Sequence, residues 1–237
     1  AEAIRLFEQT LKQMEAKLGT EHPDTLASRN NLANAYRSAG RTADAIRLFE
    51  QTLKQMEAKL GTEHPHTLQS RNGLAYAYDQ AGEFAKAEPL YRTALEQTRK
   101  RFGAEDVRTS GQMASLGTNL LYQHKYADAE PLLRDCLKIR ESKQPDARKT
   151  FNARSLLGEA LLGQKKYADA EPLLLSGYQG MKQRDKTIPR KGKIRVTEAL
   201  QRLVQLYEAT GKKEEADKWR KQLDEAKKAA AKEGSKK

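Results

Sequence analysis

The sequence contains one cysteine, one tryptophan and few aromatic residues of any kind (6%). A single thiol, Cys136, excludes an internal disulfide framework and is too few for a cysteine metal cage. No apolar run reaches the roughly 18 residues that a membrane span needs, and no charged start is followed by an apolar stretch of the secretory type. We therefore expect a cytoplasmic protein with no cofactor and no metal site.

Glycine and proline are also scarce, with 15 and 7 among 237 residues, whereas 32% of the residues are charged. This composition favours a folded helical protein over a disordered one. The net charge of +12 is concentrated near the end of the chain, because residues 181–237 hold 18 basic and 9 acidic residues. The remainder is nearly neutral, and no aromatic residues interleave the basic ones, so nucleic-acid and membrane binding are not expected.

The chain repeats itself with a period of 42 residues. The string AIRLFEQTLKQMEAKLGTEHP occupies residues 3–23 and occurs again, unchanged, at residues 45–65. Looser copies follow: TLASRNNLANAY from Thr25 matches TLQSRNGLAYAY from Thr67, and AEPLYRTAL from Ala87 matches AEPLLRDCL from Ala129. A period of about 20 to 50 residues is typical of a solenoid.

Each period contains two helical patterns, a first helix (type A) and a second helix (type B). Leu32, Ala33 and Tyr36 represent the A pattern, which recurs in every later repeat. Spacings of i, i+4 and i+7 place an apolar stripe on one face of the B pattern. The small residue of helix A precedes the alanine of helix B by 12 positions in all five pairs, namely 33/45, 75/87, 117/129, 158/170 and 204/216. This constant spacing predicts antiparallel hairpins whose helices approach closely at the small residues.

Glycine and proline mark the turn inside each hairpin. A helix C-terminus often needs positive φ, which explains the glycines at positions 40, 82 and 211. Proline is tolerated in the first helical turn, which accounts for the prolines at positions 89, 131 and 172. The B helices are therefore predicted to start near Phe84, Tyr126 and Tyr167.

The pattern L-[AG]-x-x-[YL] followed by A-x-x-x-[FYL] resembles the tetratricopeptide repeat, and the 42-residue period with LGTEHPDTL resembles its kinesin-light-chain subtype. The resemblance implies an all-α, right-handed solenoid of antiparallel helix pairs, a superhelix that binds proteins or peptides and is not an enzyme. The sequence departs from the family at the early tryptophan of the consensus, which is replaced at Arg29, Arg71, Met113, Arg154 and Leu200.

The repeats divide the chain into seven segments. We expect a partial repeat with helix B only at 1–23, repeats at 24–65, 66–106, 107–146 and 147–192, a C-terminal repeat or cap at 193–230, and a basic tail at 231–237. Because the chain opens inside a repeat, further sequence is expected upstream. The later repeats also resemble the C-terminal region of large bacterial signalling proteins that carry a serine/threonine kinase domain. This chain has no Gly-rich phosphate loop, HRD-type loop or DFG, so it would be the non-catalytic tail.

Polar residues opposite the packing stripe of the A helices are predicted to line the concave groove. They are Asn30, Asn34, Arg37, Gln69, Asn72, Tyr76, Asp79, Thr118, Asn152 and Glu159. A carboxamide can both donate to and accept from the backbone of an extended peptide, and the resemblance implies that inner-face asparagines act in this way. The alternative is that Asn30 and Asn72 bind the neighbouring long loop.

A basic segment follows the fourth repeat and is a second candidate site. Its members are Lys182, Arg184, Lys186, Arg190, Lys191, Lys193 and Arg195. Such a segment could attract phosphate, nucleic acid or an acidic partner, or it could be a solvated loop.

Three further features receive structural interpretations. The histidines lack the i, i+4 spacing of a helical metal site. Cys136 occupies a small buried position, and Trp219 is expected to cap the last hairpin.

The first helix leaves apolar surface at Ala3, Phe7 and Leu11, so an alternative function is structural self-association into a homo-oligomer.

Overall fold

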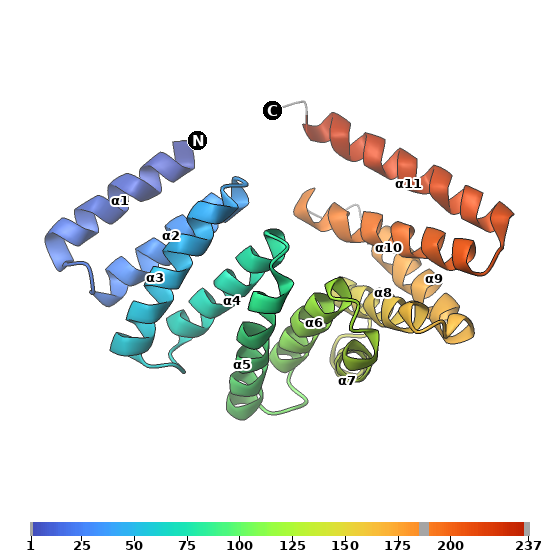
Figure 1. Ribbon diagram of the computed structural model, residues 1–237, viewed down its shortest axis with the longest axis horizontal. Coiled ribbons are helices and arrows are strands. Elements are labelled where there is room, and N and C mark those ends of the chain that lie inside the picture. Colours follow the sequence, from blue (N-terminus) through green and yellow to red (C-terminus); the bar gives the residue numbers. More distant parts are fainter. Residues whose placement is uncertain (1, 185–189, 235–237) are drawn as a thin grey trace. The chain divides into compact units, whose positions relative to one another are not determined.

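The structure is a computed structural model that describes residues 2–184 and 190–234, and every regular element in those ranges is a helix (Figure 1). The all-α prediction is confirmed. The helices divide into two compact units, Ala1–Arg101 and Phe102–Lys237.

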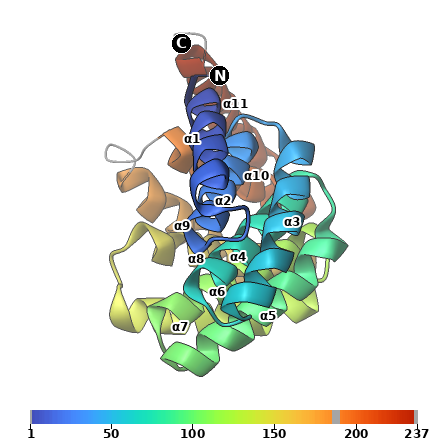
Figure 2. The ribbon, with the colours of Figure 1, turned by 90° about the vertical axis from the view of Figure 1, so that its left-hand side faces the viewer.

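Unit 1 contains two A helices and three B helices. The A helices are α2 (Pro23–Ser38) and α4 (Pro65–Gln80), and the B helices are α1 (Glu2–Leu18), α3 (Thr42–Leu60) and α5 (Phe84–Phe102). The helices from α1 to α4 each pack on the next along the chain, and α5 is bonded to α4 through Tyr91 and Asp79. The outermost helix at the start of this unit is α1 (Figures 1 and 2).

Unit 2 continues the same alternation. Its A helices are α6 (Val107–Tyr122), α8 (Arg148–Gly163) and α10 (Arg190–Ala209), and its B helices are α7 (Tyr126–Lys143), α9 (Tyr167–Gln183) and α11 (Lys213–Gly234). Again, successive helices pack on each other. Trp219 on α11 is buried and meets Tyr178 on α9 edge to face, with 5.3 Å between ring centroids. This contact agrees with the capping role predicted for Trp219.

The core of each hairpin lies where small residues face each other. Ala33 and Ala45 are both fully buried where α2 packs on α3. In unit 2 the small residue is glycine: a Cβ added at Gly158 would lie 2.7 Å from the side chain of Leu174. The helices of this pair are therefore as close as their backbones and Leu174 allow.

The turns within the hairpins share one backbone conformation. Gly40, Gly82 and Gly211 have φ of 79°, 77° and 71°, which confirms the role predicted for them. The two remaining turns place His124 (φ 58°) and Lys165 (φ 62°) at the same position. The B helices α5, α7 and α9 begin at the predicted residues.

In unit 1, arginine at the position of the consensus tryptophan forms a polar bridge between helices. Arg29 on α2 donates to Glu15 of α1 at 2.5 Å and to Gln55 of α3 at 2.7 Å. Arg71 on α4 repeats this arrangement one period later with Glu57 and Gln97. Each arginine thus ties an A helix to the B helices on both sides.

Candidate functional site

The predicted groove residues of unit 1 form a cluster on adjacent A helices. Asn30, Asn34 and Arg37 lie on α2, and Asn72 and Tyr76 lie on α4. We call these five residues the α2–α4 face. The two helices are in contact, so residues separated by one repeat in the sequence meet on one surface.

A chain of contacts connects four members of this face: Asn30, Asn34, Arg37 and Tyr76. The side chain of Asn34 donates from Nδ2 to the Asn30 carbonyl oxygen at 3.0 Å, and it accepts from Arg37 Nη2 at 3.2 Å. The guanidinium of Arg37 lies 4.8 Å from the centroid of the Tyr76 ring, a distance typical of a cation–π interaction. These contacts hold Arg37 and Asn34 in defined orientations.

Buried polar atoms on this face are left without partners. Asn30 is only 3% exposed, and neither its Oδ1 nor the Oδ1 of Asn72 accepts a hydrogen bond from the described residues. Arg37 Nε is likewise buried without an acceptor. A buried polar atom left unbonded costs about 1–3 kcal/mol, so a ligand that supplied N–H donors to the oxygens would recover part of that cost.

Tyr76 gives the face an apolar component. Its side chain is 42% exposed although it is a large ring, and Arg37 limits its position from one side. Gln69 is also exposed, one helical turn from Asn72. Asp79, by contrast, accepts a hydrogen bond from Tyr91 of α5 at 2.8 Å, so its carboxylate serves the packing of α4 on α5.

In unit 2 the predicted groove residues bond to their own fold. Thr118 donates to the carbonyl of Ala114 at 2.7 Å, within α6. Glu159 accepts from Arg202 of α10 at 2.5 Å. Asn152 has a buried Oδ1 without a partner among the described residues. Two of the three predicted groove residues of unit 2, Thr118 and Glu159, are thus engaged in contacts within the fold.

The sequence patterns did not predict an ion-pair network that joins α8 and α10. Arg202, a buried residue, also donates to Ser155 Oγ at 3.1 Å and lies 3.8 Å from Glu198, which in turn pairs with Arg195 at 2.9 Å. Burial, followed by the charge of Glu198, raises the pKa of the nearby Tyr122 hydroxyl. The i, i+4 spacing of Glu198 and Arg202 was the available sequence signal.

The described members of the basic segment contact the protein itself. Arg184 donates to the Asp146 carbonyl at 2.7 Å and lies 4.3 Å from the Phe151 ring centroid. Lys182 lies 5.4 Å from the ring centroid of Tyr178, and Arg195 pairs with Glu198. Lys186 and the side chains of Arg190, Lys191 and Lys193 lie outside the described residues.

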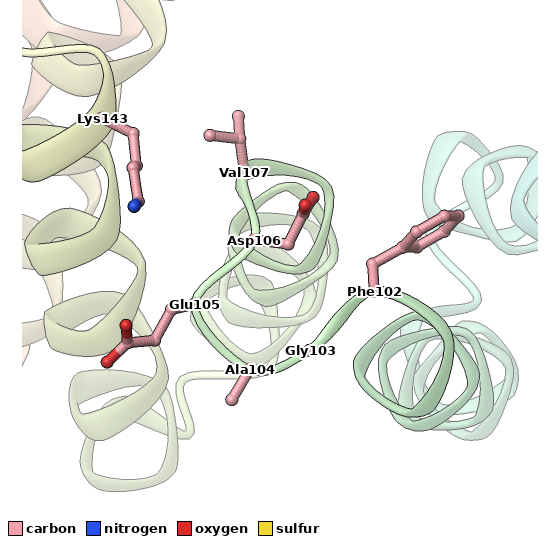
Figure 3. Close-up of a pocket in the computed structure, with 7 residues that line it drawn as sticks. All are labelled: Phe102, Gly103, Ala104, Glu105, Asp106, Val107 and Lys143. Carbon is pink, nitrogen blue, oxygen red and sulfur yellow. The ribbon is translucent and has the colours of Figure 1, made fainter.

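A hollow of about 540 Å³ lies at the connection between α5 and α6 (Figure 3). It is lined by residues 102–107 and by Lys143, which comes from α7. The carboxylate of Asp106 caps α6 by accepting from the Arg108 N–H at 2.8 Å, and the Arg108 side chain lowers the Asp106 pKa to about 2. The Asp106 carboxylate at this hollow therefore serves as the N-cap of α6.

The remaining candidates for chemistry are accounted for by packing or capping. The Cys136 thiol is buried and donates to the Ser110 carbonyl at 3.1 Å, and burial raises its pKa. His22 and His64 accept backbone N–H groups as N-caps of α2 and α4. Within residues 2–184 and 190–234, no three His, Cys, Asp or Glu side chains gather as a metal site, and no helix is long and apolar enough to cross a membrane.

This helical repeat architecture matches a known family model. The family model described as "Tetratricopeptide repeat" matches residues 1–58, 39–100 and 109–183. No protein of curated function matches the sequence.

Three solved structures illustrate the likeness. The TPR-like repeats of a kinesin light chain candidate from Podosopora anserina share 22% identity and a TM-score of 0.66, covering 87% of this chain and 96% of theirs. BtubC (BKLC) from P. vanneervenii has 16% identity and a TM-score of 0.70, with 95% and 90% covered. A Rap protein complexed with competence and sporulation factor has 16% identity and a TM-score of 0.62, with 97% and 70% covered. At these identities the similarity concerns the fold.

Proposed function

Because the chain belongs to the tetratricopeptide repeat family, we propose that it is a non-catalytic scaffold that binds a peptide segment of a partner protein along the α2–α4 face. The observation that carries this proposal is the pair of buried, unbonded oxygens of Asn30 and Asn72. The two residues are one 42-residue period apart, so they present the same acceptor from successive A helices.

The chemistry of the face suits an extended peptide. Backbone N–H groups of such a peptide would donate to the two carboxamide oxygens once the side chains turn them toward the surface, while its carbonyls could accept from exposed amide groups such as that of Gln69. Tyr76 offers an aromatic surface beside them. The solved Rap protein, which has a related fold and is complexed with competence and sporulation factor, supports the idea that such a fold takes a ligand.

A larger context is proposed on sequence resemblance alone. The later repeats resemble those that follow serine/threonine kinase domains in bacterial signalling proteins, so we assign this chain the role of a cytoplasmic regulatory or interaction tail. The basic segment receives less support as a binding site, because Lys182, Arg184 and Arg195 contact their own fold.

The test is to select binders from a random peptide library with the full chain and then measure their affinity for variants. Asn72→Ala should weaken the selected peptides about tenfold, since each bond to a buried acceptor contributes about 1–3 kcal/mol. The free energy of unfolding should stay the same or rise, because an unpaired buried oxygen is removed.

A matched control exists in unit 2. Asn152→Ala removes the same carboxamide, with the same buried and unbonded oxygen, from a position outside the α2–α4 face. It should leave the affinity unchanged. If peptides bind but are insensitive to Asn72→Ala, Asn30→Ala and Tyr76→Ala, the binding face lies elsewhere and the proposal is wrong.

A further inference from the structure

The helices α2 and α4 differ from each other along one side. The B helices that precede them are the same, since residues 3–18 of α1 and 45–60 of α3 have identical sequences. Within α2, the residues that differ from their equivalents in α4 are at positions 24, 27, 31, 34, 37 and 38. Most of these positions are three or four residues apart, which places them on one side of a helix. The α2–α4 face lies on this side, so its chemistry changes from one repeat to the next.

Arg37 is the only charged member of the α2–α4 face, and it has no carboxylate partner in the described part of the chain. The other arginines of these two helices do have one. Arg29 of α2 pairs with Glu15 at 2.5 Å, and in α4 the pair is formed by Arg71 and Glu57 at 2.6 Å. Arg37 instead donates from Nη2 to a neutral carboxamide, and its Nε is buried without an acceptor. The face therefore holds one guanidinium without a counter-ion.

The position of this guanidinium is set by α4. It lies 4.8 Å from the centroid of the Tyr76 ring. A cation–π contact uses the flat face of a guanidinium, whereas a carboxylate binds the N–H groups at its edge. A carboxylate can therefore bind Arg37 while the contact with Tyr76 is kept. Both residues lie inside the array, on α2 and α4, so this arrangement does not involve the first helix of the chain.

We propose that the α2–α4 face selects peptides that carry an acidic side chain, and that Arg37 is the specificity-determining residue that binds its carboxylate. This inference rests on the proposed function and names the class of peptide that the same face takes. Asn30 and Asn72 accept N–H groups of the peptide backbone, while Arg37 pairs with an Asp or Glu side chain beside Tyr76. Arg37 is half-buried and already held by Asn34 and Tyr76, which lowers the entropic cost of forming the pair.

A single guanidinium suits a carboxylate better than a phosphate group. A phosphorylated side chain carries about −1.5 to −2 charges at neutral pH and is typically bound by a cluster of arginines. Nucleic acid likewise needs basic side chains on several successive phosphates. Because Arg29 and Arg71 are already paired with glutamates, the face has one positive charge to offer. We therefore expect an acidic peptide and not a phosphopeptide.

The probes are two libraries of short synthetic peptides that differ only in their central residue, fixed as Glu in one library and as Gln in the other. The flanking positions are random but exclude Asp and Glu, and the C-termini are amidated, so the central side chain is the only carboxylate. The two libraries are mixed in equal amounts and captured with the full chain. Glu-centred peptides should be enriched about tenfold in the bound fraction, as expected for a charge-assisted hydrogen bond.

Variants assign this preference to Arg37. With Arg37→Gln, the two libraries should be recovered equally. Arg37→Lys should keep part of the preference, because lysine retains the charge but not the planar fork of donors. The matched control is Arg47→Gln, which removes the same charge from α3 at a side chain that is 74% exposed and outside the face, and it should keep the full preference. If Arg37 only ordered the face, Arg37→Gln would weaken both libraries alike and leave their ratio unchanged.

Two results would overturn this proposal while the proposed function stands. One is equal recovery of the two libraries by the parent chain, with recovery of both still reduced by Asn72→Ala. The other is a preference for Glu that survives Arg37→Gln, since the carboxylate would then bind elsewhere. Recovery of neither library, or recovery that Asn72→Ala, Asn30→Ala and Tyr76→Ala all leave unchanged, would instead reject the binding face itself, and this inference with it.

Discussion

The guanidinium of Arg37 stands 4.8 Å from the centre of the Tyr76 ring, and the two residues come from different repeats. Their contact joins α2 to α4 without involving the B helix between them. It also restrains the exposed Tyr76 ring, which lies one helical turn after Asn72 on α4. A half-exposed aromatic ring fixed in this way can offer a partner a surface that is already ordered, which lowers the entropic cost of binding.

The coupling between Arg37 and Tyr76 is measurable in a double-mutant cycle. Arg37→Met and Tyr76→Leu, alone and combined, should give an interaction free energy of about 0.5–1 kcal/mol in urea unfolding, as expected for a cation–π contact at an exposed site. The Leu and Met replacements retain most of the apolar volume, so a core defect is avoided. A coupling of zero would mean that the two side chains are neighbours without mutual stabilisation.

Backbone strain at the hairpin turns predicts stabilising substitutions. Lys165 has φ of 62° at the position where other turns have glycine, and a non-glycine residue in this region costs about 1 kcal/mol. Lys165→Gly should therefore raise the free energy of unfolding by up to about 1 kcal/mol. Gly82→Ala should lower it by a similar amount, because a Cβ there meets no atom within 4 Å and only the backbone conformation changes.

His124 offers an internal comparison for the same effect. It has φ of 58°, but its ring also bonds the Tyr126 hydroxyl at 2.7 Å. His124→Gly relieves the strain and loses this bond, so its gain should be smaller than that of Lys165→Gly. Equal gains in chemical denaturation would show that the histidine–tyrosine bond contributes nothing.

These turns also show how far the sequence determines the fold. The constant spacing of 12 residues between small residues in the paired helices fixed the turn position in all five hairpins, including the two without glycine. Proline at positions 89, 131 and 172 then located the starts of α5, α7 and α9. Both signals are local in the chain, which is why they could be read without a structure.

Local sequence signals predicted only part of the candidate site. Helical periodicity placed Asn30, Asn34, Arg37, Asn72 and Tyr76 on one type of helix face, and they do lie together on α2 and α4. It gave the same prediction for Asp79 and Glu159, which bond Tyr91 and Arg202. Their partners lie on other helices, so periodicity within one helix cannot reveal them.

The arginines at the consensus tryptophan position should differ in their contribution to stability. Arg71 is 4% exposed and bonds both Glu57 and Gln97, whereas Arg154 pairs with Glu141 nearer the surface. Removing one partner of a buried pair costs several kcal/mol, and less where the other partner is partly exposed, as Glu57 is, while an exposed pair contributes less than about 1 kcal/mol. Arg71→Ala should thus destabilise by about 2–3 kcal/mol and Arg154→Ala by under about 1 kcal/mol in urea unfolding. Equal effects would contradict the bridging role of Arg71.

The free energy of unfolding should depend on pH through one carboxylate of unit 2, that of Glu130. Lys166 first, and then Arg134 and Gln164, lower the pKa of Glu130 from its ordinary value of 4.5 to about 2. A carboxylate whose pKa is depressed in the folded state stabilises that state above its unfolded pKa, and the stabilisation is lost as pH falls through the folded pKa. The contribution of Glu130 is therefore complete above pH 4.5 and disappears toward about pH 2.

Glu130→Gln isolates this contribution, because it keeps the shape of the side chain and removes the charge. At neutral pH the variant should be less stable than the parent by about 1 kcal/mol. This value is small because Arg134 and Lys166, the partners of Glu130, are partly exposed to solvent. The difference should narrow below pH 4.5 and vanish only below about pH 2, where the parent carboxyl is itself protonated. Glu105→Gln, at an exposed loop position, controls for the change in net charge. A difference between Glu130→Gln and the parent that stays constant with pH would mean that Glu130 acts through its shape and neutral hydrogen bonds, and the charge of Lys166 would then have no part in joining the α8–α9 turn to α7.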